Sequence, residues 1–526
     1  MTTNDFDALV VGGGHNGLVC AAYLARSGKK VVVLEEHDVL GGACRTEELF
    51  PGCRVSTGAL WSGMLRKRII DDLELKTFGY STIRFDPQVV SLQPDGGRIT
   101  FWRNRLRTGA GILRLRPQDA SGLLRLSRLT RKVVKALDEL AWQSSPSLAQ
   151  AHHVIARYAG DAAAKVVLRS SLAELLDDYV EDERIAGALA AAPVSISNAR
   201  PFAPSTAYHF FYMMSAETNG RRGEWGFSVG GMGGTTEALA RSATASGVVI
   251  RRGARVRRLL ISEGTVVGVE IEGGLQLRSD IVISNADPRR TFLELVGPSN
   301  LSARFVQGVA ETRNQGMATA IHALLDRLPD TVMQSGKGDR LEPYKGVFVI
   351  SPSIEYVDRA YTTATNDGVS TNPVVTFCFP SVHDVSVAPR GSHLLSAFVQ
   401  FTPYASNARA VALTQDTVYR RVMQLIAAHF PNILERVVEY TVFTPRDIEM
   451  RFGMSGGHPE HVDMRLDQLF ENRPFPDSGG CHTPVRGLYL CGAGIHPGGT
   501  VTGIPGHNTA RQIIQEWSAR VGRARM

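Results

Sequence analysis

The chain lacks most of the sequence patterns that mark metal-binding and disulfide-exchanging proteins. Its six cysteines are scattered over 526 residues, without the CxxC spacing of a zinc knuckle or the CxxxxC spacing of a flavin-linked redox disulfide. A HExxH arrangement for metal catalysis is also absent. We therefore predict no metal site and no disulfide exchange, and we interpret the cysteines as cytosolic thiols.

Long apolar stretches are also missing. No apolar run reaches the length of a membrane-spanning helix, and residues 1–7 are too polar to resemble the start of a signal peptide. The hydrophobic content of 43% and the charged content of 21% are typical of a soluble globular protein. We expect a cytoplasmic location and at least two domains or subdomains, because 526 residues exceed the size at which a single core stops growing.

One basic region has almost no acidic residues. Ten arginines and lysines lie between Arg103 and Lys135, and Asp119 is the one acid among them. An apolar stripe at helical spacing runs through the same region: Leu126, Leu129, Val133, Leu137 and Leu140. Such a helix either lies on an anionic membrane surface or turns its arginines to water as part of a domain, and we favour the second. Nucleic acid is not an expected partner, because aromatic residues that stack on bases are not interleaved with the basic ones.

The most informative segment is a glycine-lined turn near the N-terminus. The apolar run Ala8 to Val11 predicts a buried strand, and Gly12, Gly14 and Gly17 then open an amphipathic helix that leads to a second strand, Val31 to Leu34. Glu35 follows that strand directly, where an acid accepts hydrogen bonds from an adenosine ribose. The combination predicts a bound dinucleotide, and an acid at this position argues against a 2′-phosphate.

Two further segments complete the same type of domain. From Gly247 the chain alternates apolar and polar residues, with turn signals at Glu263-Gly264 and at Gly273-Gly274, and ends in the apolar run 281–284. This pattern predicts a β-meander followed by a core strand. Near the C-terminus a short strand, 488–491, leads through a glycine-rich loop to a closing helix, about 508–517. We expect residues 1–75, 226–287 and 478–526 to form one discontinuous dinucleotide-binding domain. Residues 76–225 and 288–477 would form a substrate domain with a helical part that acts as a lid or faces a membrane.

Four of these motifs carry a family resemblance: VVGGGHNGLVCAAYLARSGKKVVVLEEHDVLGGACRTEE, VGGMGGTTEALA, GARVRRLLISEGTVVGVEIEGG with SDIVISNADP, and GLYLCGAGIHPGGTVTGIPGHNTA. The chain resembles the phytoene desaturase-like branch of the amine oxidase and glutathione reductase superfamily, and within it the pyridine nucleotide-disulfide oxidoreductase domain-containing protein 2 group. The resemblance implies an α/β fold: a Rossmann-like domain of the glutathione reductase type, with a β-meander, and an inserted α+β substrate domain. It also implies FAD as the cofactor.

The resemblance further implies which residues hold FAD. The first motif would bind the ADP half, Val256 would meet the adenine through its backbone, and the last motif would cover the pyrophosphate, ribityl and isoalloxazine groups. The cofactor-binding residues expected in this way are Gly12, Gly14, His15, Asn16, Gly17, Glu35, Glu36, Gly42, Ala43, Thr46, Val256, Gly492, Ala493, Gly503 and Ile504. A helix N-terminus at Gly503 would stabilise the reduced, anionic ring.

A second dinucleotide site is an open alternative. The glycines of GGMGG, residues 230–234, precede a helix, and the strand that follows ends in Arg251 and Arg252, which suit the 2′-phosphate of NADPH. That site would make the protein an NADPH-dependent flavin reductase or saturase. However, these glycines do not match GxGxxG, so we favour a single dinucleotide.

The reaction follows less directly from the sequence. The amine oxidases of the superfamily place an arginine directly after the paired glycines, whereas Gly41 and Gly42 are followed here by Ala43, which argues against amine oxidation. We expect hydride transfer between a lipophilic or quinone-like molecule and FAD, with oxygen or a quinone as the electron acceptor. His496 and Thr500 are the candidate proton-handling residues. A non-catalytic flavoprotein that acts through partners is the other functional class that stays open.

The inserted segments also contain an aromatic and methionine cluster, YHFFYMMSAE, at residues 208–217. It is either ordinary core or the wall of an apolar substrate pocket. The oligomeric state is not encoded in any motif.

Overall fold

The computed structural model describes residues 6–333, 340–404 and 415–524. Its first large sheet has five parallel strands in the order β11-β2-β1-β15-β21. The strands are β1 (Ala8–Val11), β2 (Val31–Leu34), β11 (Val249–Arg251), β15 (Val282–Ser284) and β21 (Leu488–Leu490). All three segments that the sequence assigns to the dinucleotide-binding domain therefore contribute strands to one sheet, although the boundaries themselves stay a prediction.

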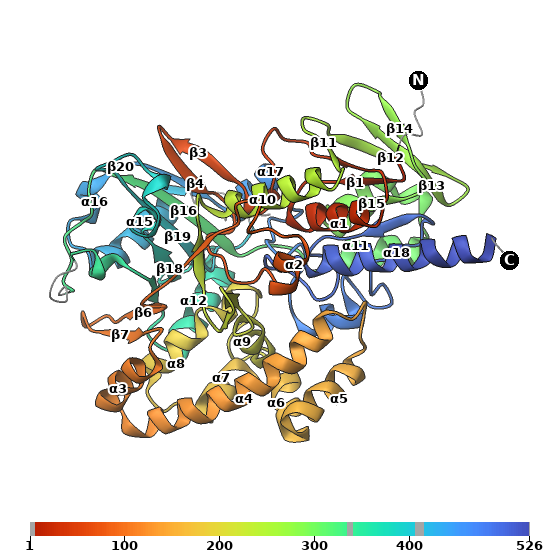
Figure 1. Ribbon diagram of the computed structural model, residues 1–526. Coiled ribbons are helices and arrows are strands. Elements are labelled where there is room, and N and C mark those ends of the chain that lie inside the picture. The colour runs from red at the N-terminus through yellow and green to blue at the C-terminus, as the bar shows by residue number, and fades with distance from the viewer. Residues whose placement is uncertain (1–5, 334–339, 405–414, 525–526) are drawn as a thin grey trace.

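Three helices pack together beside this sheet: α1 (His15–Arg26), α10 (Met232–Ala245) and α18 (Ile504–Ala524). Helix α18 begins four residues earlier and ends later than the pattern predicts. The expected β-meander is the antiparallel sheet of β12 (Val256–Ser262), β13 (Thr265–Ile271) and β14 (Gln276–Arg278). In Figure 1 the meander projects from the upper right of the molecule, and α1 and α18 lie beneath it.

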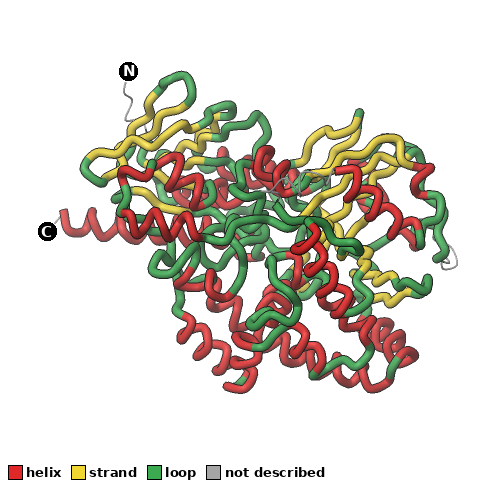
Figure 2. The backbone as a smooth tube through the Cα atoms, turned by 180° about the vertical axis from the view of Figure 1, so that it is seen from behind, coloured by secondary structure: helices red, strands yellow, loops and turns green. Residues whose placement is uncertain are grey.

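The second sheet has seven strands in the order β20-β16-β19-β18-β17-β6-β7, antiparallel except for the β17–β6 pair. Its strands are β6 (Val89–Leu92), β7 (Arg98–Phe101), β16 (Ala318–Leu325), β17 (Val347–Ile350), β18 (Val374–Cys378), β19 (His393–Gln400) and β20 (Val437–Phe443). Figure 2 shows the two sheets on opposite sides of the molecule and a helical layer beneath them. This arrangement confirms the predicted fold class, a Rossmann-like domain with an α+β insertion.

The remaining elements are short strands and helices. The short strands form three two-stranded sheets: β3 (Thr46–Phe50) with β4 (Cys53–Ser56), β5 (Thr82–Arg84) with β10 (Gly226–Ser228), and β8 (Glu217–Thr218) with β9 (Arg221–Arg222). The helices are α2 (Lys67–Asp72), α3 (Arg105–Leu115), α4 (Pro117–Ala141), α5 (Leu148–Ala159), α6 (Asp161–Arg169), α7 (Leu172–Asp177), α8 (Glu183–Ala190), α9 (Ala207–Met213), α11 (Ala303–Glu311), α12 (Ile354–Asp367), α13 (Pro380–His383), α15 (Gln415–Ala427), α16 (Ile433–Arg436) and α17 (Pro445–Phe452).

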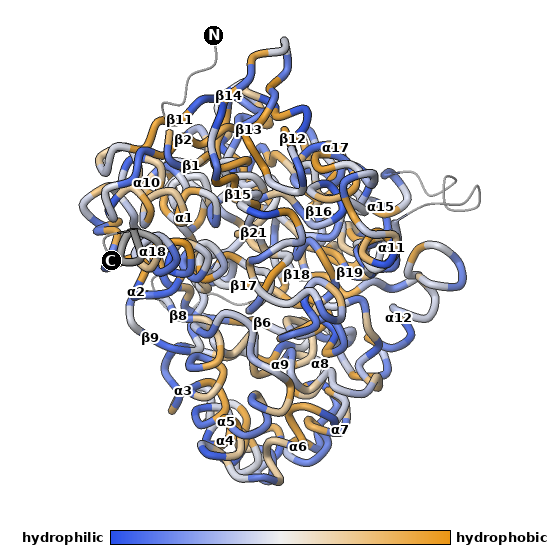
Figure 3. The backbone as a smooth tube through the Cα atoms, turned by 90° about the vertical axis from the view of Figure 1, so that its right-hand side faces the viewer, coloured by the Kyte–Doolittle hydropathy of each residue, from blue (hydrophilic) through white to orange (hydrophobic). Residues whose placement is uncertain are grey.

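The apolar stripe predicted on the basic region belongs to the helical core. Leu126, Val133, Leu137 and Leu140 of α4 are buried and share a core with α5 and α9, and Leu129 packs against it. This stripe is therefore not a free membrane-facing surface, in agreement with the favoured interpretation. In Figure 3 the tube of the helical layer alternates between hydrophilic and hydrophobic residues, as expected for helices with one buried face. Within the described ranges, no helix combines the length and hydrophobicity that crossing a bilayer requires.

All six cysteines are buried and unpaired. The described part of the chain also contains no cluster of three or more His, Cys, Asp or Glu side chains arranged to hold a metal ion.

Candidate functional site

The glycine turn has the geometry of a dinucleotide-binding loop. Gly12 has a φ of 97°, which favours glycine, and it joins β1 to the N-terminus of α1. A Cβ on Gly17 would lie 2.2 Å from the carbonyl oxygen of Gly12, so this glycine lets the helix pack closely on the strand. Gly14 is the N-cap residue of α1, so no side chain caps the first turn of the helix. The N–H groups of that turn are thus available to an anion.

The Glu35 side chain is hydrogen-bonded to the backbone of this turn. The side chain is buried, its Oε2 accepts a hydrogen bond from the N–H of Gly13 at 2.7 Å, and its Oε1 accepts one from the N–H of His37 at 3.0 Å. Each carboxylate oxygen has a second lone pair that these bonds leave free. A ribose hydroxyl that enters the cavity beside Glu35 can therefore donate to it.

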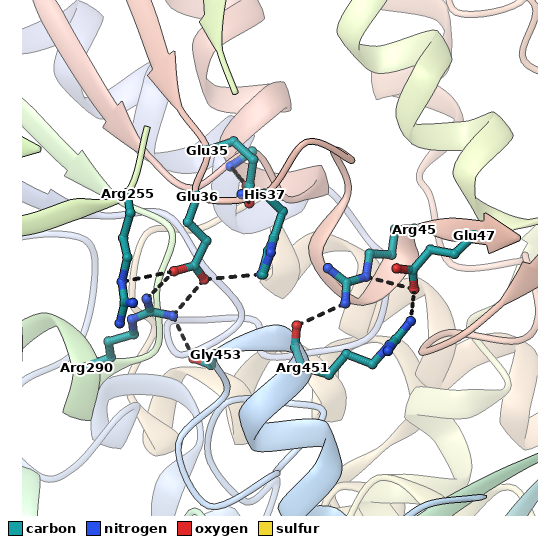
Figure 4. Close-up of polar contacts among 10 residues, drawn as sticks. Glu35, Glu36, His37, Arg45, Glu47, Arg255, Arg290, Arg451 and Gly453 are labelled. Carbon is teal, nitrogen blue, oxygen red and sulfur yellow. Dashed lines mark hydrogen bonds and ion pairs between the residues drawn. The ribbon is translucent and has the colours of Figure 1, made fainter. Parts of the chain in front are cut away.

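Glu36 lies beside Glu35 but points to a pair of arginines (Figure 4). Its carboxylate receives two hydrogen bonds from Arg290, at 2.7 and 3.1 Å, and forms an ion pair with Arg255 at 3.7 Å. Burial acts to raise the pKa of Glu36, but the hydrogen bonds and charge of Arg290 lower it overall. Glu36 therefore has a structural role besides the predicted cofactor-binding one, because its bonds to Arg290 connect the end of β2 to the segment 290–296.

A second polar cluster ties α17 to the start of β3 and the residue before it (Figure 4). Arg45 bonds to Glu47 at 3.1 Å and to the carbonyl oxygen of Arg451 at 3.0 Å, and the Arg451 side chain reaches Glu47 at 2.8 Å. The segment after α17 is bonded to Asp287, which accepts from both the N–H and the hydroxyl of Ser455. Residues 453–457 match the GxSxG pattern of serine hydrolases, but the Ser455 hydroxyl is committed to Asp287. These contacts close the cavity from the substrate-domain side.

One continuous cavity runs from the glycine turn into the interface with the second sheet. Most of the predicted cofactor-binding residues line it: Gly12, Gly14, His15, Asn16, Glu35, Glu36, Gly42, Ala43, Val256 and Ala493. Thr500 lines it as well. At the far end the wall is apolar and aromatic, with Trp61, Met64, Ile196, Met213, Trp225 and Phe398. Met213 is the one residue of the cluster 208–217 on this wall, and most of that cluster belongs to the core instead.

Five predicted cofactor-binding residues lie behind the cavity wall. Gly17 packs α1 on β1, and Gly503 and Ile504 pack against the core at the start of α18. Thr46 accepts a hydrogen bond from the N–H of Gly233 at 2.8 Å, and Gly492 packs against His461. These residues shape the turns that carry the lining residues.

His496, predicted as a proton-handling residue, does not line this cavity. It borders a separate small pocket with Tyr208 and Tyr212, and its Nε2 bonds to the carbonyl oxygen of Leu140 at 2.9 Å. Burial lowers the pKa of His496 to about 4, so the ring is neutral at physiological pH. This position does not suit the expected catalytic role, because the ring faces α4 and not the cavity.

Backbone N–H groups of the GGMGG turn, residues 230–234, are hydrogen-bonded to side chains of this protein. Gly230 donates to Asp384, Met232 to Ser56 and Gly233 to Thr46, all within 2.9 Å. The N–H groups that would hold a phosphate of NADPH are therefore already bonded, which argues against a second dinucleotide at this turn.

Sequence reasoning missed several polar residues of the site, and five of them come from two segments. Asn285, Asp287 and Arg290 follow β15, so the end of that strand brings them to the turn. Glu460 and His461 lie in the segment after α17. The signal for this last pair was the cluster HPEH, residues 458–461, in a chain with 14 histidines.

Comparisons with known proteins agree with this geometry. The model of the family described as "Flavin containing amine oxidoreductase" matches residues 17–514. The rat protein "Pyridine nucleotide-disulfide oxidoreductase domain-containing protein 2" is 31% identical, covering 97% of this chain and 94% of the relative. A subunit of the limonene dehydrogenase of Castellaniella defragrans and the neurosporene-forming phytoene desaturase of Cereibacter sphaeroides are each 25% identical, covering 98% of this chain and 95% of the relative.

Solved structures show the same fold. An oxidoreductase from Methanosarcina mazei superimposes with a TM-score of 0.61 at 18% identity, covering 97% of this chain and 99% of that one. The predicted resemblance is confirmed by these matches, which extend over nearly the whole chain. The chain belongs to the family of flavin-containing amine oxidoreductases and is a FAD-dependent oxidoreductase.

Proposed function

We propose that the protein is a dehydrogenase or desaturase that introduces a carbon–carbon double bond into a mostly apolar small molecule. The observation that carries the proposal is the continuity of the cavity, which begins at the dinucleotide turn and ends at the apolar wall around Trp61, Met213 and Trp225. A ligand at that end would be held mainly by buried apolar area. The names of two relatives, which refer to a limonene dehydrogenase and a phytoene desaturase, support this class of substrate.

The residues present fit FAD. Five buried polar atoms on the cavity lining have no hydrogen bond of normal geometry within the described residues: His15 Nε2, Asn16 Oδ1, Trp61 Nε1, His461 Nδ1 and Thr500 Oγ1. Buried polar groups are costly when unpaired, so their gathering along one cavity indicates a polar ligand that pairs with them. The uncapped first turn of α1 is the matching site for a pyrophosphate.

We assign the parts of the site as follows. Glu35 would accept hydrogen bonds from the adenosine ribose, the N-terminus of α1 at Gly14 would face the pyrophosphate, and Val256 would border the adenine. Gly42 and Ala43 would lie along the middle of the cofactor, and Ala493 and Thr500 near the ring. When bound, FAD supplies an acceptor for the hydride that leaves the substrate, while the aromatic wall orients the substrate and excludes water.

The test is anaerobic mixing of the holoprotein with limonene and with phytoene, following the flavin absorbance. We expect at least one apolar hydrocarbon to bleach the flavin, and a primary amine to leave it unchanged. Efficient reduction by the amine would overturn the reaction class. Reoxidation by oxygen and by a soluble quinone would then identify the acceptor, for which we propose one of these two.

The same experiment separates the two functional classes. Photoreduction without any substrate shows whether the flavin can cycle at all. If the flavin neither reduces nor reoxidises, the protein is a non-catalytic flavoprotein that acts through partners.

We also propose an anionic membrane surface as a partner, now through residues other than the buried stripe of α4. Leu106, Leu113 and Leu124 are 85%, 53% and 62% exposed on α3 and α4. Exposed arginines flank them on the same helices, among them Arg105, Arg114 and Arg125. Apolar side chains beside basic ones suit the surface of an anionic bilayer.

A further inference from the structure

A buried carboxyl group, that of Glu460, lines the cavity beside the glycine-rich loop that carries Gly499 and Thr500. Glu460 is 7% exposed and lines the cavity together with His461 and Thr500. Its Oε2 accepts a hydrogen bond from the N–H of Thr500. A Cβ on Gly499 would lie 1.4 Å from the same oxygen, so the glycine-rich loop leaves room for this carboxyl.

Glu460 differs from the other acids of the cavity because its carboxyl group has fewer hydrogen bonds and ion pairs. Glu35 is bonded to two backbone N–H groups, and Glu36 forms ion pairs with two arginines. Asp287 accepts bonds from Arg290 and Ser455. Within the described residues, Glu460 forms no ion pair and its carboxyl has the single bond from Thr500. It is therefore the acid on this cavity that is free to exchange a proton with a ligand.

The charged and titratable groups around Glu460 come from several elements. They are His15 of α1, Cys44 of the helical turn Gly42–Cys44, Tyr212 of α9, and His458, His461 and Arg473 of the segment after α17. Burial lowers the pKa values of His15 and His461 to about 4 and that of His458 to about 3, and it raises those of Cys44 and Tyr212 to about 12. At neutral pH these five histidine, cysteine and tyrosine side chains are uncharged.

Arg473 is the fixed positive charge of this region. It is fully buried and donates to backbone carbonyl oxygens only, including those of Glu460 and Ala493. Burial raises the pKa of Glu460 to about 7, while the N–H of Thr500 and the charge of Arg473 oppose the rise. A carboxyl with this pKa both accepts and releases a proton near neutral pH, as a general base must.

We propose that Glu460 is the proton acceptor of the dehydrogenation, an inference that rests on the proposed function. In this reaction one C–H bond of the substrate would break with its electron pair, and bound FAD would supply the acceptor for the hydride. The adjacent C–H bond then gives its proton to the Glu460 carboxylate, and its electron pair forms the double bond. The substrate would lose two electrons and two hydrogens: one hydrogen leaves as the hydride with both electrons, the other leaves as the proton on Glu460, and oxygen or a quinone would later take up the electrons.

The first test does not depend on turnover. Infrared difference spectra of the holoprotein between about pH 5 and pH 9 report the C=O stretch of a protonated carboxyl. We expect a buried carboxyl band with a midpoint near pH 7 in the wild type and in Glu272→Gln, an exposed control on the meander, and its loss in Glu460→Gln. A wild type without such a band, or a band that persists in Glu460→Gln, would overturn the inference. Burial also raises the pKa of Asp463, so if Glu460→Gln does not fold, the informative variant is Asp463→Asn: the wild-type band should persist in it, and loss of the band would overturn the inference.

The second test uses the reaction. With limonene or phytoene as reductant, Glu460→Gln should reduce its flavin about 100-fold or more slowly, with unchanged FAD content, and the wild-type rate should rise with pH through about 7. A wild-type rate in Glu460→Gln would remove Glu460 from the reaction. If neither hydrocarbon reduces the wild type while the infrared band still titrates, the proposed function fails and the role of Glu460 as its base fails with it. In that case the infrared spectra still show that the Glu460 carboxyl titrates near pH 7, independently of the reaction.

Discussion

The buried carboxyl of Glu460 gives a quantitative prediction for stability. Burial raises its pKa from the ordinary 4.5 to about 7 in the folded protein. Between these values the folded chain binds more protons than the unfolded chain, so the free energy of unfolding falls as the pH rises. One pKa unit corresponds to about 1.4 kcal/mol. The wild type should therefore lose about 3 kcal/mol of stability at this site between about pH 4.5 and pH 7.

Glu460→Gln removes this dependence but keeps an oxygen for the N–H of Thr500. We expect the variant to gain about 3 kcal/mol relative to the wild type when the pH is raised from about 5 to about 8. Any change in the free energy of unfolding that the amide causes equally at both pH values cancels in this difference. The assay is urea unfolding at each pH, with both proteins in the same cofactor state. Parallel pH dependences of the two proteins would refute the reasoning, because they would mean that Glu460 has an ordinary pKa.

Three further predictions follow from the site and the surface. Glu35→Ala should weaken FAD binding by about 1–3 kcal/mol, because it removes the acceptor for the ribose and the partner of the Gly13 N–H; unchanged FAD occupancy after dialysis would contradict this role. His496→Ala should leave flavin reduction by hydrocarbons nearly unchanged, since the ring faces Leu140 and not the cavity; a loss of turnover with normal FAD content would restore the role predicted from the sequence. The protein should float together with anionic liposomes at low salt but not at high salt, and Leu106→Glu should weaken flotation at low salt. Absence of flotation of the wild type at both salt concentrations would contradict the membrane proposal.

The glycine turn could be predicted because its function and its local structure require the same residues. The spacing of Gly12, Gly14 and Gly17, followed by Glu35 after the second strand, encodes a phosphate turn in contiguous sequence. The grouping of three distant segments into one domain could be expected as well, since each glycine-rich segment lies next to a short apolar strand. The meander was recognisable from the alternation of apolar and polar residues.

The other half of the site could not be predicted because it is assembled by tertiary contacts. Glu460 reaches the cavity only through the fold of the segment after α17, which Arg473 holds by bonds to backbone carbonyl oxygens. His496 lies in the predicted loop, but the direction of its side chain depends on its packing against α4, and no local pattern encodes that direction.

The identity of the cofactor tests the central claim most directly. Purified protein should be yellow, and denaturation should release FAD, identified by mass spectrometry, at about one molecule per chain. The glycine turn and Glu35 address an ADP group that FMN lacks. Release of FMN, or of a nicotinamide dinucleotide alone, would contradict the assignment of the cavity.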